Sequence, residues 1–453
     1  MKRIISMLLA CAVALTFLAA CGSAPVDKPD SPVVNPDVDE SLPNDPGNEP
    51  TDDPQVQPLS EMQELVLEQD IAMAFPEPDG LEGYDELGEL SFNLYRQTEG
   101  ANGLKNNVFS PISAAIALGM LYEGTNGETA DELESVIGWG KPTSSMMFGS
   151  LMCEYADISK LTDTTLNLAN AAFFSPRLKN PADNAILSLR DAFRAQMFRG
   201  ELSTDSAREF INGWVSEKTD GEIPSVLGEN IDQSAVLVLI NTILLDAKWA
   251  NPFINYGIES KMPFTCADGE KAELPCLADT RYMSYIDTDE LTGAIMDYSD
   301  GRLKFMAVKP KDGDINGLMD KLDYSYFTSA IAAAQEGSCI FNMPKFSIES
   351  DIDLNDCVKE LGAKLIFDPD NADLTGFGES EYGNVFVSEI FQKAKIDVDD
   401  EGTRAAAATV VIANDACAII EYHEVILDSS FFWCVYDGET NVPLFMGTYT
   451  GNE

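Results

Sequence analysis

Hydrophobic positions recur at helical spacing in the first third of the chain and in strand-like runs after it. An amphipathic helical pattern begins near Leu81, and further helical patterns cover 111–122 and 129–137. Three later apolar runs predict strands: 235–245, 339–348 and 384–398. Neither a linker nor an internal repeat interrupts the chain from 81 to 453. The pattern therefore predicts one large α+β domain with mainly antiparallel sheet.

The segment before this domain begins with a processing signal. Residues 1–20 have a basic start and an apolar stretch from Ile4 to Leu18, which is too short to span a bilayer comfortably. Small residues then lead into Cys21, as in a bacterial lipoprotein, where this cysteine is lipidated and begins the mature protein. The alternative is an ordinary signal peptide that is cut after Ala20.

Residues 21–80 form an acidic, proline-rich stretch in which Lys28 is the only basic residue. Such a composition cannot bury enough apolar surface to fold, and its prolines and like charges keep it extended. We expect a disordered tether that holds the domain away from the membrane.

The chain carries 76 acidic and 29 basic residues, a formal net charge of -47. This charge repels nucleic-acid phosphates and anionic membrane surfaces. We therefore expect no nucleic-acid partner, and contact with the membrane only through the N-terminal lipid. The predicted location is the extracellular face of a bacterial membrane, or the medium if the anchor is absent.

Few residues offer catalytic or metal-binding chemistry. Seven cysteines remain beyond Cys21, an odd number without the spacing of a zinc site or a complete disulfide framework. Cys266 and Cys276 could close a hairpin, and the sequence leaves this open. The single histidine, His423, would have to serve any Ser-His-Asp or Cys-His site alone. We predict no enzyme activity, no cofactor and no metal.

Several short motifs resemble the serpin family of protease inhibitors, and they occur in family order. The first is Asn107-Val108-Phe109-Ser110-Pro111-Ile112-Ser113. The others lie at 119–121, 127–133, 167–171, 211–215, 239–242, 343–346, 372–376 and 443–447. The resemblance implies a serpin fold: three mainly antiparallel β-sheets surrounded by eight or nine helices, with an exposed C-terminal reactive-centre loop.

The resemblance also implies roles for single residues. Four small polar side chains would satisfy one another where the central sheet parts, and an indole would pack at the top of that sheet: Ser110, Ser113, Asn170, Asn241 and Trp249. One position departs from the family, which usually has His-Lys-Ala before the long loop where this chain has Gln392-Lys393-Ala394. Glutamine both donates and accepts hydrogen bonds, so the network can survive with altered energetics of opening.

A contradictory stretch lies between Ile396 and the last strands, in a segment that we call the bait loop (residues 397–422). Residues 405–413 contain no charge, proline or glycine and end in β-branched residues, as in a buried strand. Exposed permanently, such a segment would invite aggregation. A segment with the composition of a buried strand that lies in a loop implies two conformations, one exposed and one buried in a sheet.

The bait loop resembles the serpin hinge, an acidic stretch followed by Gly-Thr and small residues: Gly402, Thr403, Arg404, Ala405, Ala406, Ala407, Ala408 and Thr409. In that family a protease cleaves the loop and forms an acyl-enzyme. The freed segment then inserts as a new central strand and drags the protease with it before hydrolysis finishes. The native state is accordingly metastable.

Strand periodicity gives this hinge two distinct faces. If Thr403 faces the interior after insertion, every second residue does so too, and these are small or apolar: Ala405, Ala407, Thr409, Val411 and Ala413. The hinge charge, Arg404, falls on the outer face. This arrangement favours an active inhibitor, because an unpaired charge on the inner face would make insertion costly.

The cleaved bond has two candidate positions. Counting forward from the hinge places it between Ala416 and Cys417, whereas counting back from the last strands places it near Ile419 and Ile420. Hinge length has to match the strand that forms, which favours Ala416. Small and aliphatic residues here suit elastase-like or subtilisin-like serine proteases, with cysteine proteases secondary. Trypsin-like targets are disfavoured, because no Lys or Arg follows Arg404.

The sequence thus predicts a monomeric, suicide-type inhibitor of serine endopeptidases. The competing interpretation is a serpin-like surface binding protein without inhibitory activity, or a serpin that is cut as a plain substrate. The rate of loop insertion decides between inhibitor and substrate.

Overall fold

The computed structural model describes residues 61–65, 83–102, 105–254, 259–381, 383–403 and 422–451. The predicted signal peptide, most of the tether and residues 404–421 of the bait loop lie outside the described residues. Among the described helices, none is long and apolar enough to cross a bilayer.

Nine α-helices occur among the described residues: α1 (Tyr84–Asn102), α2 (Pro111–Glu123), α3 (Gly127–Ile137), α4 (Lys141–Leu161), α5 (Asp183–Asp191), α6 (Asp205–Lys218), α7 (Ile315–Lys321), α8 (Tyr324–Ala332) and α9 (Asn355–Leu361). Two short 3-10 helices follow, η1 (Leu365–Phe367) and η2 (Thr375–Phe377). The helices expected at 81–95, 111–122 and 129–137 correspond to α1, α2 and α3.

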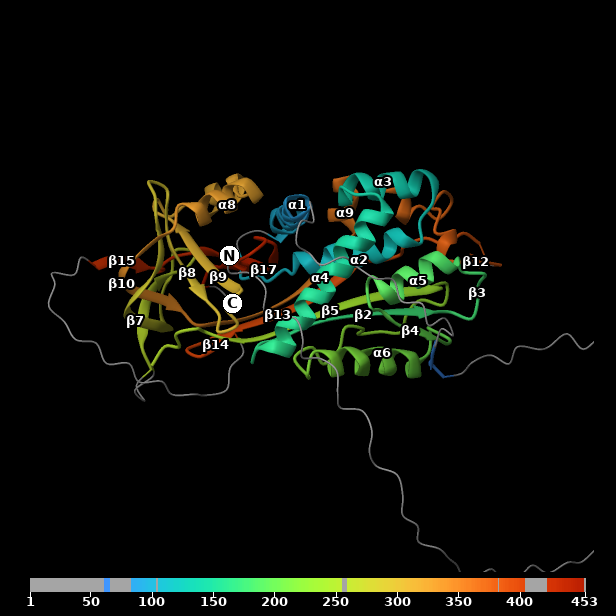
Figure 1. Cartoon of the computed structure of the whole chain (residues 1–453), viewed down its shortest axis with the longest axis horizontal. Coiled ribbons are helices and arrows are strands. Elements are labelled where there is room, and N and C mark those ends of the chain that lie inside the picture. Colours follow the sequence, from blue (N-terminus) through green and yellow to red (C-terminus); the bar gives the residue numbers. More distant parts are fainter. Residues whose placement is uncertain are drawn as a thin grey trace, which may run out of the picture. The chain divides into compact units, whose positions relative to one another are not determined.

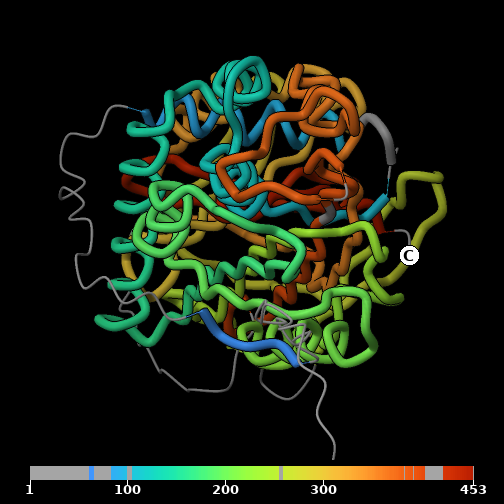
Figure 2. Tube along the Cα trace, turned by 90° about the vertical axis from the view of Figure 1, so that its right-hand side faces the viewer, coloured from blue at the N-terminus to red at the C-terminus, as the bar shows by residue number. Residues whose placement is uncertain are grey.

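One continuous layer is a seven-stranded sheet, which we call the main sheet. Its strands lie in the order β1 (Gln63–Glu64), β4 (Gln196–Arg199), β2 (Thr165–Phe174), β5 (Leu237–Lys248), β14 (Gly402–Thr403), β13 (Phe391–Val398) and β11 (Phe346–Asp353). All neighbours are antiparallel except β2 and β4. Figure 2 views the domain from the end that carries β1.

A second, eight-stranded sheet contains β15 (Tyr422–Ile426), β10 (Gln335–Pro344), β7 (Lys271–Asp287), β8 (Leu291–Asp297), β9 (Leu303–Pro310), β16 (Phe431–Asp437) and β17 (Pro443–Tyr449), with β6 (Lys261–Thr265) pairing β7. The third sheet has two strands, β3 (Leu178–Lys179) and β12 (Glu379–Ser380). These sheets and helices confirm the predicted fold class.

Helices cover both faces of the main sheet (Figure 1). On one face, α6 packs Trp214 and Val215 with Phe173 of β2 and Ile240 of β5. On the other face lies α2, which is buried along nearly its whole length. Successive side chains of β5 therefore reach different layers, as the pleat of a strand requires.

Two predicted strand runs differ from the observed strands. The run 339–348 is divided at Lys345, because β10 pairs with β7 and β11 pairs with β13, in different sheets. The run 384–398 forms a strand only from Phe391 onward. Before that point the backbone does not bond to a strand, since Val387 N–H donates to Ile366 O in η1 at 2.8 Å. Apolar content alone did not distinguish a strand from a buried loop.

Cys266 and Cys276 are free thiols, so no disulfide closes the β6–β7 hairpin. The amide of Cys266 bonds to Glu270 O near the turn, whereas that of Cys276 bonds to Ser260 O at the far end of the hairpin. The five residues of β6 lie between these ends, so the ends are six residue steps apart, about 20 Å at the usual rise. Burial raises the pKa of both thiols.

Candidate functional site

The main sheet contains a lane, bounded by β5 on one side and β13 on the other, that a strand fills only at one end. There β14 lies between them: Thr403 pairs with Ala247 of β5 and with Val398 of β13. Beyond β14, the described part of β5 pairs with β2 and that of β13 pairs with β11, and no ladder joins β5 to β13. Two strand spacings, about 9.5 Å, separate β5 from β13 where β14 intervenes.

Close packing at the filled end requires glycine at position 402. A Cβ atom on Gly402 would lie 2.1 Å from the carbonyl oxygen of Ala247 and 2.8 Å from Cα of Lys248. Those contacts are far inside van der Waals distance, and the obstacle is backbone, which cannot move aside cheaply. Gly402 therefore allows the chain to enter the lane beside β5.

Thr403 is buried and faces the interior of the domain. Its Oγ1 lies 2.5 Å from the hydroxyl of Tyr298, whose ring stacks on Trp249 at 4.7 Å. The Trp249 indole N–H donates to Asp399 O at 2.9 Å. Burial raises the pKa of Tyr298, so its hydroxyl stays neutral and the cluster holds the start of the hinge without a charge.

Below β14 the lane opens into a cavity of about 680 Å³. Its walls are β5 on one side and β13 with the preceding 384–390 segment on the other, and α2 contributes Ser113, Ala114 and Ala117. A smaller space directly beyond Thr403 is lined by Ile243, Leu245 and Ile396. The inner wall next to Thr403 is therefore apolar, whereas the larger cavity is lined by both apolar and polar side chains, among them Asn241 and Gln392.

A polar chain crosses the floor of the lane. Ser113 Oγ of α2 donates to Asn241 Oδ1 of β5, and Asn241 Nδ2 donates to Asn170 Oδ1 of β2 at 2.5 Å. Asn170 Nδ2 in turn donates to Phe193 O at 2.5 Å. Ser110 joins separately, because its Oγ donates to Leu444 O at 2.8 Å. The structure thus links Ser113, Asn241 and Asn170 directly, and Ser110 through the start of α2.

Gln392 of β13 ties the other side of the lane to the same helix. Its Oε1 accepts from Ser110 N–H at 2.8 Å, and its Nε2 donates to Ser110 O at 2.7 Å. Both amide atoms are satisfied by one backbone unit, which accounts for a buried glutamine at this position. Neither partner titrates near neutral pH.

An ion pair lies over the outer side of the lane. Lys395 of β13 pairs with Glu222, in the segment that follows α6, at 2.6 Å, and with Asp397 at 3.3 Å. The first of these contacts raises the pKa of Lys395. Glu222 and Lys395 line the same small space as Thr403, so a strand that lengthens from Thr403 has to pass beneath this pair.

Of the hinge, only Gly402 and Thr403 are described. Arg404, Ala405, Ala406, Ala407, Ala408 and Thr409 lie outside the described residues, as do both candidate bonds, at Ala416 and Cys417 and at Ile419 and Ile420. Cys21 also lies outside them.

The chain matches a known family over most of its length. A family model described as Serpin (serine protease inhibitor) matches residues 85–451. The chain belongs to the serpin family. Most serpins are protease inhibitors and not enzymes.

Individual serpins resemble this chain over most of their length. Leukocyte elastase inhibitor from Xenopus laevis is 28% identical over 372 residues, which cover 79% of this chain and 96% of that protein. Plasminogen activator inhibitor 1 from Sus scrofa is 27% identical and covers 83% of this chain and 96% of its own. The native-state crystal structure of the thermophilic serpin tengpin superposes with a TM-score of 0.77 at 26% identity, covering 86% of this chain and all of that one.

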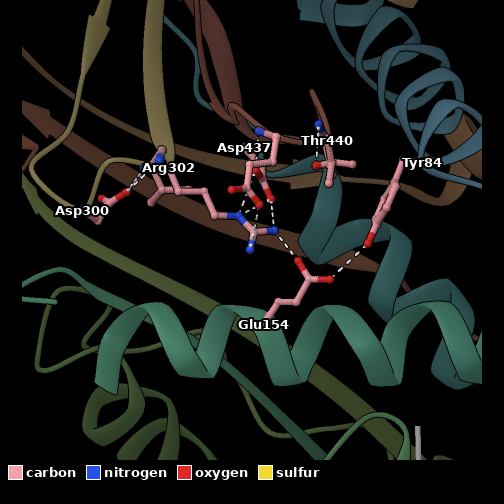
Figure 3. Close-up of polar contacts among 9 residues, drawn as sticks. Tyr84, Glu154, Asp300, Arg302, Asp437 and Thr440 are labelled. Atoms are coloured by element: carbon pink, nitrogen blue, oxygen red, sulfur yellow. Dashed lines mark hydrogen bonds and ion pairs between the residues drawn. The ribbon is translucent and has the colours of Figure 1, made fainter. Parts of the chain in front are cut away.

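Sequence reasoning missed an ion cluster that links α4 to the eight-stranded sheet (Figure 3). Arg302, before β9, contacts the fully buried Asp437 at 2.5 Å and also Glu154 of α4, which accepts from Tyr84 OH at 3.1 Å. Burial opposes the charge of Arg302, but the hydrogen bonds to Asp437 and Glu154 outweigh it and raise its pKa. These residues are distant in sequence, and no local motif marks them.

Proposed function

We propose that this serpin is a suicide-type inhibitor of elastase-like or subtilisin-like serine proteases, and that cleavage of the bait loop lets β14 lengthen down the lane. One observation carries the proposal: Gly402 and Thr403 already pair with both walls of the lane, and beyond them no ladder joins the described strands β5 and β13 to each other. Strand addition between two free edges satisfies backbone groups on both sides, which is a large driving force.

The observed pairing sets the register of the strand that would form. Both ladders are antiparallel, so each residue added after Thr403 moves one residue back along β5 and β13. The inward positions then meet buried or network residues: Ala405 meets Leu245 and Ile396, Ala407 meets Ile243 and Ala394, and Thr409 meets Asn241 and Gln392. The small side chains of Ala405 and Ala407 suit their apolar neighbours, and the Thr409 hydroxyl suits its polar neighbours.

The same register places Arg404 on the outer face. Its neighbours there would be Asp246 of β5 and Asp397 of β13, which are both partly exposed. Arginine between two carboxylates is favourable, whereas a carboxylate at this position would be repelled. The one hinge charge therefore agrees with the charges of the walls that would receive it.

Insertion explains how the chemistry becomes a trap. The protease serine attacks the carbonyl of the cleaved bond, most favourably that of Ala416, and the new amine at Cys417 leaves with the C-terminal fragment. If the strand forms before water hydrolyses the ester, the attached protease is carried along the lane and its catalytic site is distorted. If hydrolysis is faster, the chain is only a substrate.

We propose further that the domain acts at the cell surface. Serpins are mostly secreted or extracellular. The signal at 1–20, the lipid on Cys21 and the acidic tether to residue 80 would hold residues 81–453 outside a bacterial membrane. Mass spectrometry of the membrane-extracted protein tests this through a diacylglyceryl group on Cys21. An unmodified N-terminus at Cys21 would contradict it.

The inhibitor proposal is tested by mixing the purified domain with pancreatic elastase or subtilisin. We expect a covalent complex that survives detergent and boiling, together with loss of protease activity at near-equal amounts of the two proteins. The N-terminus of the small released fragment then gives the cleaved bond. Cleaved chain with fully active protease would instead support the substrate interpretation.

A further inference from the structure

Three neighbouring strands, β7, β10 and β15, expose large apolar side chains on their outer face, and β15 begins directly after residues 404–421 in sequence. The exposed fractions are 70% for Tyr282 of β7, 48% for Tyr422 of β15 and 36% for Ile340 of β10. Aromatic side chains of this domain are otherwise mostly buried, so two tyrosines this exposed on regular strands are unusual.

The strand register gathers these side chains into one patch. Ser338 of β10 pairs with Tyr282 on one side and with Tyr422 on the other, so the two tyrosines flank it in a single row. Ile340 lies two residues further along β10, on the same face as Ser338. Adjacent strands lie about 4.8 Å apart, which places the tyrosine backbones about 10 Å from each other. We call Tyr282, Ile340 and Tyr422 the aromatic patch.

The inner face of the same strands is firmly packed. Met283, Cys339, Phe341 and Val425 alternate with the patch residues and are buried in the main core. The patch is therefore not core that has come loose: it is the outer side of a rigid platform, and a partner that binds there needs to order little backbone.

The patch adjoins the bait loop. Tyr422 is the first described residue after 404–421, and β15 is the edge strand of its sheet. Ala416 is six positions before Tyr422, at most about 22 Å of extended chain, and Ile420 is two positions before it, at most about 7 Å. A protease that holds the candidate bonds in its active site must therefore lie close to the outer face of β15, β10 and β7, at one end of the domain (Figure 1).

We propose that the aromatic patch is a second docking surface for the target protease, which contacts it with an apolar area at the rim of the substrate cleft. This proposal rests on the proposed function. Glu336 and Glu424 are exposed on the same outward face as Ile340, so the matching area on the protease carries basic residues around its apolar centre. Tyrosines are frequent in such contacts, because they bury much area with few rotatable bonds.

Charge argues against the other occupants of this surface. A second copy of the chain would bring a further formal charge of -47, and an anionic lipid surface would repel the same carboxylates. A basic protease surface is attracted both by the net negative charge of the chain and by the carboxylates of Glu336 and Glu424 beside the patch.

The test separates docking from trapping. Encounter affinity is measured with subtilisin and elastase whose nucleophilic serine is replaced by alanine, so that no acyl-enzyme forms. We expect Tyr282→Ser to weaken the dissociation constant about tenfold, as for one well-buried interface tyrosine. Tyr282 lies far from the loop in sequence, so its change leaves the bait itself intact. Leu161→Ser is the matched control, because Leu161 is 82% exposed at the end of α4, outside the patch.

With active protease, Tyr282→Ser should lower the second-order rate constant of inhibition by the same factor and leave the stoichiometry unchanged. Equal dissociation constants for Tyr282→Ser, Leu161→Ser and the natural chain overturn the docking surface, even if inhibition is efficient. If Tyr282→Ser weakens the dissociation constant as expected but no covalent complex forms with active protease, the docking surface stands and the inhibitor proposal is refuted. Concentration-dependent dimers that Tyr282→Ser abolishes would assign the patch to a second copy and also overturn the proposal.

Discussion

A charge placed on alternate residues of the hinge tests the register of the inserted strand. The two substitutions are Ala405→Glu and Ala406→Glu, which are one residue apart and chemically identical. From the pairing of Thr403, Ala405 would face inward between Leu245 and Ile396, which are 5% and 3% exposed. Ala406 would face the opposite side, between Leu244 of β5, which is 8% exposed, and Lys395 of β13, which is partly exposed and already pairs with Glu222 at 2.6 Å.

The expected magnitudes differ widely. An uncompensated charge buried at position 405 costs about 3–5 kcal/mol. If the inserting strand meets that cost in its transition state, insertion slows by about two to three and a half powers of ten, at 1.36 kcal/mol per tenfold. At position 406 the new carboxylate meets the ammonium group of Lys395 on one side and the buried Leu244 on the other. The ion pair offsets most of the burial, so the expected effect is about 1 kcal/mol, or roughly fivefold.

The measurement is the stoichiometry of inhibition, read beside the yield of detergent-stable complex. Ala406→Glu should behave nearly as the natural chain, whereas Ala405→Glu should be cleaved without trapping the protease. Ala405→Gln has similar bulk without charge and separates steric from electrostatic cost. Because the cleaved bond is distant in sequence, all variants should be cut at similar rates. If both Glu variants trap the protease equally well, or both lose the covalent complex to the same extent, the predicted register of the inserted strand is refuted.

Three further changes test single contacts around the lane. Gly402→Val should expel β14, because its Cβ would collide with the carbonyl of Ala247, and hydrogen exchange at the amide of Thr403 should accelerate at least tenfold. Gln392→His should make unfolding pH-dependent near 6.5, with stability lost on acidification as the imidazole can no longer accept from Ser110 N–H; a flat profile would contradict this. Burial raises the pKa of Glu123, so its contribution to stability is complete below the unfolded value and is lost as pH rises through the folded pKa. Glu123→Gln should therefore gain stability relative to the natural chain between acidic and neutral pH in urea titrations, and a constant difference between them would contradict this.

Local patterns predicted the first three helices and the strand β5, because each has a strong periodicity that matches its buried face. They failed at 384–390, where apolar residues pack beneath loops, and at Lys345, where the chain passes from one sheet to another. Both failures concern partners that lie far away in sequence.

For the site, the family motifs in the sequence identified the polar residues on the lane floor. They did not identify the hydrogen-bond partners of these residues. Ser110, for example, contacts Leu444 O and the amide of Gln392, and only the packing of α2 between β5 and β13 decides this. The Arg302 cluster carried no sequence signal, since its members come from α4, the start of β9 and the end of β16.

The sequence by itself determined the composition of the hinge: small, uncharged at alternate positions, and too apolar to remain in solvent permanently. These are local properties of side chains, and period two follows from backbone geometry alone. Only the tertiary structure decided that Gly402 and Thr403 pair with both walls of the lane, and therefore which wall residues the following positions would meet. The register with β5 relates segments that are about 155 residues apart in the chain, so no local pattern contains it.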